Sequence, residues 1–199
     1  MFTAAEPDQE QAAVFTPYNE AKSIMTKTAT PRIYVACLAA YSSGDLHGTW
    51  IDCDQDAEEI NKEIKAMLEL SPEEDAEEFA IHDFDNWQGI QIHEYESIDK
   101  IAELAALIIK HGKAFAAHYN HYGTEATEET FDNSYQCESE SEEAFVRELW
   151  EENGQLEKLE KLGISDHWID WEAIATDLFI NSYYSESASN TGVYVFSRI

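Results

Sequence analysis

Apolar positions become continuous after Pro31 and predict two strands there. Every position from 33 to 38 is apolar in the segment Ile-Tyr-Val-Ala-Cys-Leu, which is typical of a strand buried on both faces. Residues 42–44 (Ser-Ser-Gly) interrupt the run, and residues 48–52 predict a second strand. A further strand-like segment covers residues 78–83. The pattern therefore places several strands near the start of the chain.

Helical spacing of apolar residues begins after Asp56. This residue, with Glu59 three positions later, has the spacing of a capping box at a helix start. The apolar residues that follow at helical spacing are Ala57, Ile60, Ile64, Met67 and Leu68. Residues 71–74 (Ser-Pro-Glu-Glu) predict another helix start, because proline and acidic residues favour the first turn of a helix.

Helices dominate the rest of the chain. The predicted helical segments are residues 98–111, 113–122, 128–135, 141–153 and 156–162, and a last helix from Trp171 after the cap residue Asp170. Residues 192–196 predict a terminal strand, which we expect to pair with residues 179–184 across the polar turn 185–191. The sum is a mixed α+β fold with a strand-rich start, a helical middle, and helices with a hairpin at the end.

Residues 1–30 lack such periodicity. They are rich in Ala, Thr, Gln, Glu and Pro, and we expect a flexible N-terminal extension. The sequence contains no run of 18 apolar residues, no secretory leader, and no CxxC spacing among its three cysteines. We therefore expect a cytoplasmic protein with no membrane span and no disulfide framework.

Charge is the most unusual property of the chain. Its 199 residues include 41 Asp and Glu against 12 Lys and Arg, which gives a formal net charge of −29. A surface this acidic repels nucleic acid and anionic lipid, so we expect neither as a partner. Residues 45–85 hold fifteen acids and residues 125–152 hold eleven. Any partner recognised by charge should be basic.

The spacing of these acids suggests one specific kind of partner. Several acids in residues 138–152 lie three or four positions apart, about 5–6 Å on a helix face, which is comparable to the phosphate spacing on a DNA strand. A stiff array of carboxylates would fit the Lys- and Arg-lined groove of a DNA-binding protein. Composition by itself nevertheless favours a generic acidic protein that is kept soluble by its charge. Adaptation to high salt fits less well, because it usually favours Asp and depletes Lys, whereas here Glu outnumbers Asp 28 to 13 and Lys outnumbers Arg 9 to 3.

The sharpest local motif resembles a calcium-binding loop. Asp52, Asp54, Asp56 and Glu63 occupy its positions 1, 3, 5 and 12, but Ala57 stands where the sharp turn needs glycine. A solvated acidic turn and helix cap explains the segment better, and calcium binding is kept as the weaker alternative.

Other candidate sites are weaker still. His118 and His121 form an HxxH pair, with Cys137 nearby in sequence, but no fourth ligand has a suitable spacing. The chain contains no GxSxG, Walker A or GxGxxG motif. We therefore expect no catalytic residue, no metal and no cofactor.

Five stretches of the sequence carry a family resemblance. They are residues 31–52 (with PRIYVACLAAY and GTWID), 77–84 (EEFAIHDF), 131–145 (with FDNSYQ and SEEAF), 168–175 (WIDWEAIA) and 195–199 (VFSRI). In this order and spacing, the sequence resembles the ArdA family of antirestriction proteins over about residues 31–199.

The resemblance implies a fold and a function. It implies an elongated α+β protein of three small domains: a strand-rich domain over residues 31–92, a helical middle domain over 93–133, and a C-terminal α+β domain over 134–199. It further implies a homodimer, paired through the third domain, that displays carboxylates like bent duplex DNA. Such a dimer would occupy the DNA-binding groove of Type I restriction-modification enzymes, inhibit restriction and modification, and protect incoming mobile DNA without any enzymatic activity or cofactor.

The candidate partner-binding residues are all acidic. Those in or beside the matched stretches are Asp52, Asp83, Asp132, Glu142 and Glu143. The charge argument adds Asp54, Asp56, Glu58, Glu59, Glu73, Glu74, Asp75, Glu77, Glu78, Glu125, Glu128, Glu129, Glu138, Glu140, Glu151 and Glu152. The alternative function is an acidic protein-binding module or chaperone for another basic, DNA-binding protein.

Overall fold

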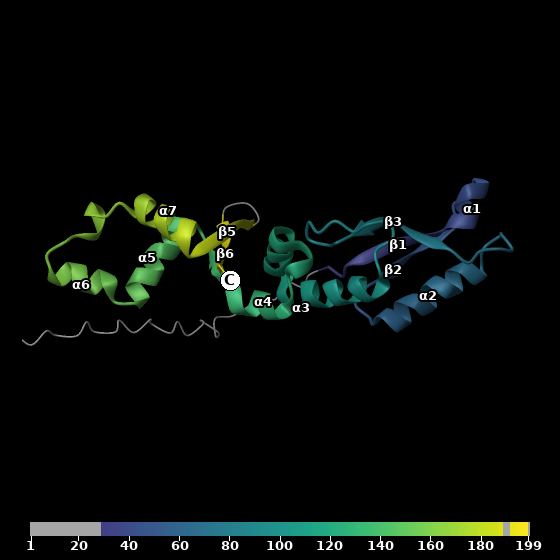
Figure 1. The fold of residues 1–199 in the computed structure, drawn as a ribbon, viewed down its shortest axis with the longest axis horizontal. Coiled ribbons are helices and arrows are strands. Elements are labelled where there is room, and N and C mark those ends of the chain that lie inside the picture. The colour runs from purple at the N-terminus through teal and green to yellow at the C-terminus, as the bar shows by residue number, and fades with distance from the viewer. Residues whose placement is uncertain (1–28, 189–191, 199) are drawn as a thin grey trace, which may run out of the picture.

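A three-stranded antiparallel sheet, sheet A, forms one end of the molecule. A computed structural model describes residues 29–188 and 192–198, so the expected extension over residues 1–30 lies almost wholly outside the described residues. The elements of the first half are β1 (Arg32–Cys37), α1 (Leu38–Ser43), β2 (Gly48–Asp52), α2 (Ala57–Glu69) and β3 (Phe79–Asp85). Sheet A has the strand order β2-β1-β3. Helices α2 and α3 (Ile98–Tyr122) lie along one of its faces (Figure 1).

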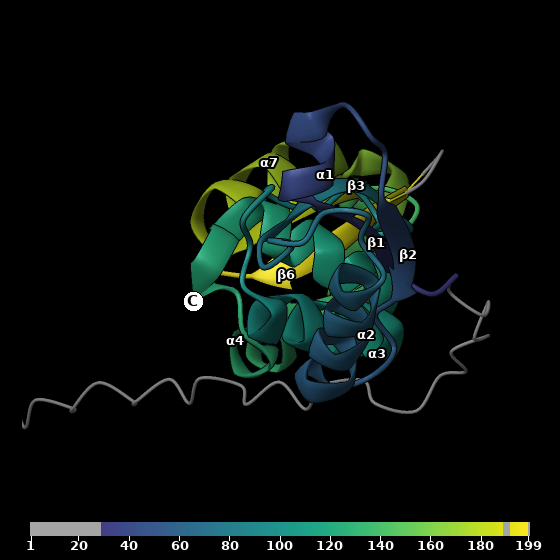
Figure 2. The same cartoon turned by 90° about the vertical axis from the view of Figure 1, so that its right-hand side faces the viewer.

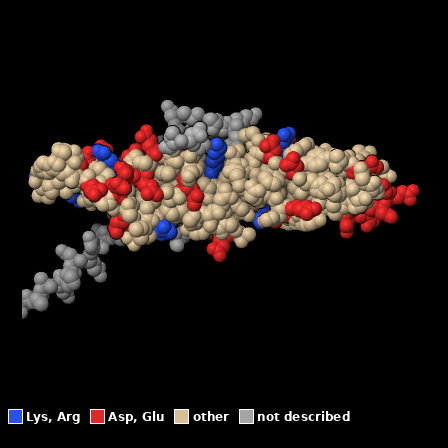
Figure 3. Space-filling model, turned by 90° about the horizontal axis from the view of Figure 1, so that it is seen from above, with Lys and Arg blue, Asp and Glu red and all other residues tan. Residues whose placement is uncertain are grey.

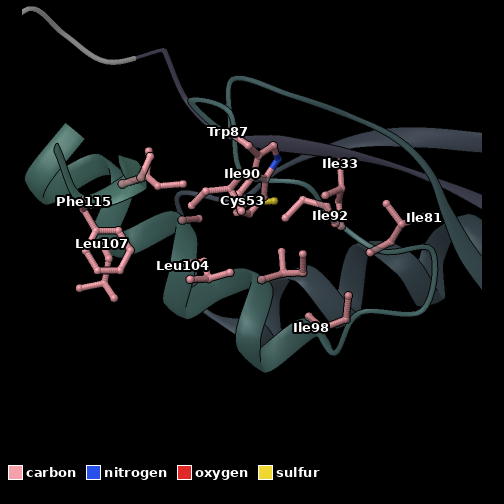
Figure 4. Close-up of a cluster of buried hydrophobic side chains, with 14 of the residues drawn as sticks. Ile33, Cys53, Ile81, Trp87, Ile90, Ile92, Ile98, Leu104, Leu107 and Phe115 are labelled. Carbon is pink, nitrogen blue, oxygen red and sulfur yellow. The ribbon is translucent and has the colours of Figure 1, made fainter. Parts of the chain in front are cut away.

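Alternation along β1 decides which face of sheet A is covered. Ile33 and Val35 are fully buried on the helix side, whereas Tyr34 is only half-buried on the other side. Figure 4 shows the apolar side chains of the sheet, of the β3–α3 connection and of α3 converging in one core. Burial of this apolar surface is the main source of stability for this half of the molecule.

Predictions for α2 and its C-terminal side had different outcomes. The cap is confirmed, since the Asp56 side chain accepts a hydrogen bond of 2.9 Å from the backbone N–H of Glu59. The helix start predicted at residues 71–74 is wrong. The Ser71 hydroxyl accepts from the backbone N–H of Glu73 in a turn, and the chain must reach the start of β3 at Phe79 within a few residues.

Helix α3 bends at Gly112, where the sequence predicts one helix to end and another to begin. Gly112 has φ 65° and ψ −147°, a conformation that only glycine adopts readily. The helical segment before the bend packs near α2, and the segment after it contacts β5 (Tyr183–Ala188) in the second half of the molecule.

The second half contains a second antiparallel sheet, sheet B. Its elements are η1 (Gly123–Glu125), α4 (Glu128–Ser134), β4 (Tyr135–Ser139), α5 (Glu142–Glu152), α6 (Gln155–Lys161), η2 (Asp166–Trp168), α7 (Trp171–Asn181), β5 and β6 (Gly192–Ser197). The strand order is β4-β6-β5.

The terminal hairpin is confirmed, but its first strand begins at Tyr183 rather than Phe179, because Phe179 is buried in α7. Strand β4 was not predicted. Part of the expected turn, residues 189–191, lies outside the described residues.

Strand β6 separates two packed faces. Val195 belongs to a core formed with α5 and α7, whereas its neighbour Phe196 belongs to the core that continues through α3 to sheet A. Both side chains are fully buried. The described residues form an elongated mixed α+β molecule that is narrow when viewed along its long axis (Figures 1 and 2). None of the described helices is long and apolar enough to cross a membrane.

Candidate partner-binding surface

The carboxylates predicted to bind a partner lie almost entirely on the surface. Eighteen of the 21 are exposed, and Glu73, Glu128 and Glu142 are half-buried. They form four groups in chain order, and these groups lie on elements of both halves of the elongated molecule. Figure 3 shows acidic side chains spread over the visible face and gathered at the end that carries α1.

The first group surrounds the start of α2. Its members are Asp52, Asp54, Asp56, Glu58 and Glu59. Asp56 caps the helix, and acids in the first turn are favoured by the helix dipole. Lys62 Nζ lies 3.3 Å from Glu58 Oε1 and 2.6 Å from Glu59 Oε1, and these contacts raise the pKa of Lys62. One lysine therefore offsets part of the charge of this group.

The second group occupies the connection between α2 and β3, together with β3 itself. Its members are Glu73, Glu74, Asp75, Glu77, Glu78 and Asp83. Among the described residues, none of these six acids forms an ion pair. These acids do not lie on a helix, so no helix packing restrains their side chains. Their carboxylates can therefore face solvent or a basic partner.

The third group lies on and just before α4. Its members are Glu125, Glu128, Glu129 and Asp132. Glu128 differs from the other three because its carboxylate contacts both Lys110 Nζ and His111 Nε2 at the end of the first α3 segment. Hydrogen bonds from Lys110 and then His111 lower the pKa of Glu128. Glu128 therefore joins α4 to α3, whereas the other three remain available at the surface.

The fourth group follows β4 and α5. Its members are Glu138, Glu140, Glu142, Glu143, Glu151 and Glu152. The Ser185 hydroxyl donates a 2.6 Å hydrogen bond to Glu142 Oε1, which links α5 to β5 and gives Glu142 a structural role. Glu151 and Glu152 stand in the last turn of α5, where no basic residue balances the negative end of the helix dipole. Acidic residues at this position lower the stability of the helix. This cost is consistent with a role of the two carboxylates in partner binding.

Helix packing adds a carboxylate that sequence spacing could not indicate. Glu172, in the first turn of α7, lines a shallow hollow together with Glu140, Glu142 and Glu143. Glu172 lies 29 positions after Glu143, and only the packing of α7 against α5 brings them together.

Most basic side chains are already engaged. Seven of the ten Lys and Arg residues in the described part of the chain form ion pairs with carboxylates. Exposed pairs of this kind contribute little to stability, but they remove positive charge from the outer surface. The remaining field is strongly negative, so the surface can attract basic groups and repels anions.

Residues of the two alternative metal motifs form hydrogen bonds with other groups of the chain. His118 is buried, with its Nδ1 2.8 Å from the Tyr184 hydroxyl and its Nε2 3.0 Å from Thr130 Oγ1. In the acidic turn, the Gln55 side-chain amide donates to both Asp52 O and Glu63 Oε1. Within residues 29–188 and 192–198, no group of three or more His, Cys, Asp or Glu side chains could hold a metal ion.

Comparison with known families decides the relationship of the chain. The family model described as antirestriction protein (ArdA) matches residues 33–193. The chain belongs to the ArdA family. Membership of ArdA implies an antirestriction function and, in general terms, an interaction with restriction-modification enzymes. A search of curated proteins found no match.

Proposed function

We propose that this ArdA protein is a DNA mimic that occupies the DNA-binding groove of Type I restriction-modification enzymes. The observation that carries the proposal is the distribution of exposed carboxylates over both halves of an elongated molecule. A compact acidic patch would fit one basic spot, whereas an extended array can follow a groove that normally holds duplex DNA. Occupation of that groove would block both restriction and modification, and it requires no cofactor and no chemical step.

Counterion release supplies the physical driving force. A groove lined with Lys and Arg and a surface of carboxylates each hold counterions, which are released when the two surfaces meet. Binding should therefore weaken steeply as salt increases, as DNA binding by the same groove does. Because many weak contacts share the binding energy, no single carboxylate should be essential.

The test is competition with DNA. Labelled duplex DNA is bound to a purified Type I methyltransferase, and the full-length protein is added at low and at moderate salt. We expect stoichiometric displacement that weakens with salt and leaves the DNA chemically unchanged. Lack of displacement at both salt concentrations would overturn the proposal and would favour the alternative, a module that binds another basic, DNA-binding protein.

We also propose that the protein is a homodimer paired through its C-terminal half. Large apolar side chains are exposed there, including Leu162, Ile164 and Trp168 in and after the α6–η2 connection and Ile180 on α7. Leu162 is 75% exposed and Trp168 is 68% exposed. Exposed apolar side chains of this size favour contact with another protein surface, and a second copy would extend the carboxylate array.

A further inference from the structure

The face of sheet A that points away from the helices carries an arginine between two aspartates. Antiparallel pairing places Arg32 of β1 opposite Asp52 of β2 on one side and opposite Asp85 of β3 on the other. Arg32 Nη2 lies 2.9 Å from Asp85 Oδ2, and its guanidinium carbon lies 4.6 Å from the centroid of the Trp50 ring. The sheet thus already holds one guanidinium group between a carboxylate and an aromatic ring.

The next row of the same face is aromatic. Tyr34 of β1 lies opposite Trp50 of β2 and Asp83 of β3. The Tyr34 and Trp50 ring centroids are 5.6 Å apart, and their planes are tilted by 58°, so each ring offers its own face. Gly48 makes room for this arrangement, because a Cβ there would clash with the Val35 carbonyl oxygen and would stand 2.8 Å from the Tyr34 hydroxyl oxygen. The glycine therefore allows both the close strand pairing and the approach of the tyrosine ring to β2. We call Tyr34 and Trp50 the aromatic platform.

The aromatic platform is accessible. Trp50 is 38% exposed, Tyr34 is half-buried, and Asp52 and Asp83 are exposed. Helices α2 and α3 cover the opposite face of the sheet (Figure 1). Viewed from above, this half of the molecule shows uncharged surface between its carboxylates (Figure 3). A charge array alone does not require such an uncovered aromatic surface.

We propose that the aromatic platform binds an arginine side chain of the basic partner enzyme by stacking, with Asp52 and Asp83 as the nearby carboxylates. This inference rests on the proposed function, because it assigns a specific contact within the surface that replaces DNA. Guanidinium groups stack on aromatic faces and are more weakly hydrated than ammonium groups, so the platform should prefer arginine to lysine.

Local charge supports an arginine rather than a neutral occupant. Asp85 is paired with Arg32, which largely cancels the charge of both. Asp52 and Asp83 form no ion pair with any residue that the structure describes. The face therefore keeps a negative charge beside its aromatic rings. The contact between Arg32 and Trp50 shows that this tryptophan accepts a guanidinium group at stacking distance. Arg32 already covers part of the Trp50 ring, so the partner's arginine would use the exposed ring surface that Arg32 leaves free.

The first experiment compares two peptides of equal charge. Hexa-arginine and hexa-lysine are titrated into the full-length protein by calorimetry, together with the variants Trp50→Leu and Tyr34→Leu. We expect the wild type to bind hexa-arginine more tightly, and each variant to lose about two- to five-fold of that affinity with little change for hexa-lysine. Tyr95→Leu is the matched control, since Tyr95 is 70% exposed and does not belong to the platform. Circular dichroism spectra of each variant serve to check that it is folded.

The second experiment uses the partner enzyme. In the DNA displacement assay, Trp50→Leu should reduce potency by a similar factor at low and moderate salt, because stacking depends little on ionic strength. Equal potency of this variant and the wild type, together with equal affinity for the two peptides, would overturn the platform while leaving DNA mimicry intact. Failure of the wild type to displace DNA would instead overturn the proposed function, and the peptide comparison would still decide whether the platform recognises arginine.

Discussion

His118 and Tyr184 share a hydrogen bond of 2.8 Å that joins α3 to β5 inside the core. The opposite ring nitrogen of His118 lies 3.0 Å from Thr130 Oγ1. That hydroxyl accepts from the backbone N–H of Thr127 and donates to the Thr127 carbonyl oxygen, so its single hydrogen is already used. A neutral ring satisfies both contacts when Nε2 donates to Thr130 and Nδ1 accepts from the Tyr184 hydroxyl. Burial of the ring disfavours the charged imidazolium.

Protonation of His118 should therefore destabilise the fold. Burial, and secondarily the nearby His121, lowers the pKa of His118 from 6.5 to about 4. The unfolded chain binds a proton below about pH 6.5, whereas the folded chain resists it until about pH 4. Stability from this group is thus complete above pH 6.5 and is lost as the pH falls toward 4. The shift corresponds to at most about 3 kcal/mol in the free energy of unfolding.

His118→Gln isolates this effect from the titration of the many carboxylates. Urea unfolding followed by circular dichroism at pH 7.5 and pH 5.0 should show a larger loss of stability on acidification for the wild type than for the variant. Equal changes in the two proteins would show that His118 does not resist protonation in the folded state.

The bend at Gly112 predicts a strong effect of a single methyl group. Gly112→Ala should lower the free energy of unfolding by about 1–3 kcal/mol, because alanine disfavours the observed backbone angles. A straight α3 would relieve that strain but would move its second segment away from sheet B. Gly154→Ala is the control, since Gly154 has φ 66° and ψ 18°, a left-handed conformation that other residues adopt at lower cost. Urea unfolding of both variants should show the larger loss for Gly112→Ala.

The fold was predictable from sequence where local signals acted alone. The Asp56 cap and the break at Gly112 depend on neighbouring residues, and both are found where the pattern places them. Strand β4 was missed because its five residues follow α4 directly and are stabilised by pairing with β6, more than 50 positions away. The helix start at residues 71–74 was wrong because tertiary pairing of β3 with β1 leaves no room for a helix before it.

The candidate surface was predictable as a set of exposed acids but not as an arrangement. The charge argument selects acidic residues, and acidic side chains are normally exposed in folded proteins. The exposure of most candidate residues was therefore expected from their residue type. The structural role of Glu142 depends on Ser185, which only the sheet brings near. The row formed by Asp52, Arg32 and Asp85 likewise requires the strand order and register of sheet A.

The carboxylate array predicts graded effects of neutralisation. Glu138→Gln, Glu140→Gln and Glu143→Gln should each weaken displacement of DNA by no more than about five-fold, because exposed charges contribute about 0–1 kcal/mol each. The triple variant should lose much more and should show a shallower dependence on salt. Glu142 is left unchanged because its contact with Ser185 would confound binding with stability.

Glu→Asp substitutions at the same positions keep the negative charge while they shorten the side chain, so they separate the effect of charge from the effect of side-chain shape. The triple variant with Asp at positions 138, 140 and 143 should remain close to wild type in the displacement assay. If instead one Glu→Gln change abolished activity, the array would not share its binding energy, and a discrete site would be required.

The proposed dimer predicts that polar substitutions at the C-terminal half will yield a monomer. The chain mass is 22.7 kDa, so light scattering after size-exclusion chromatography should give about twice that value for the wild type. Leu162→Ser combined with Trp168→Ser should shift the mass to that of one chain, because two exposed apolar contacts are removed. Leu46→Ser is the matched control, since Leu46 is 83% exposed in the first half and its substitution should leave the dimer intact.

A wild type that runs as a single chain, or a double variant that stays dimeric, would contradict pairing through this surface. Because a monomer would present half of the carboxylate array, the double variant should also displace DNA less effectively than the control.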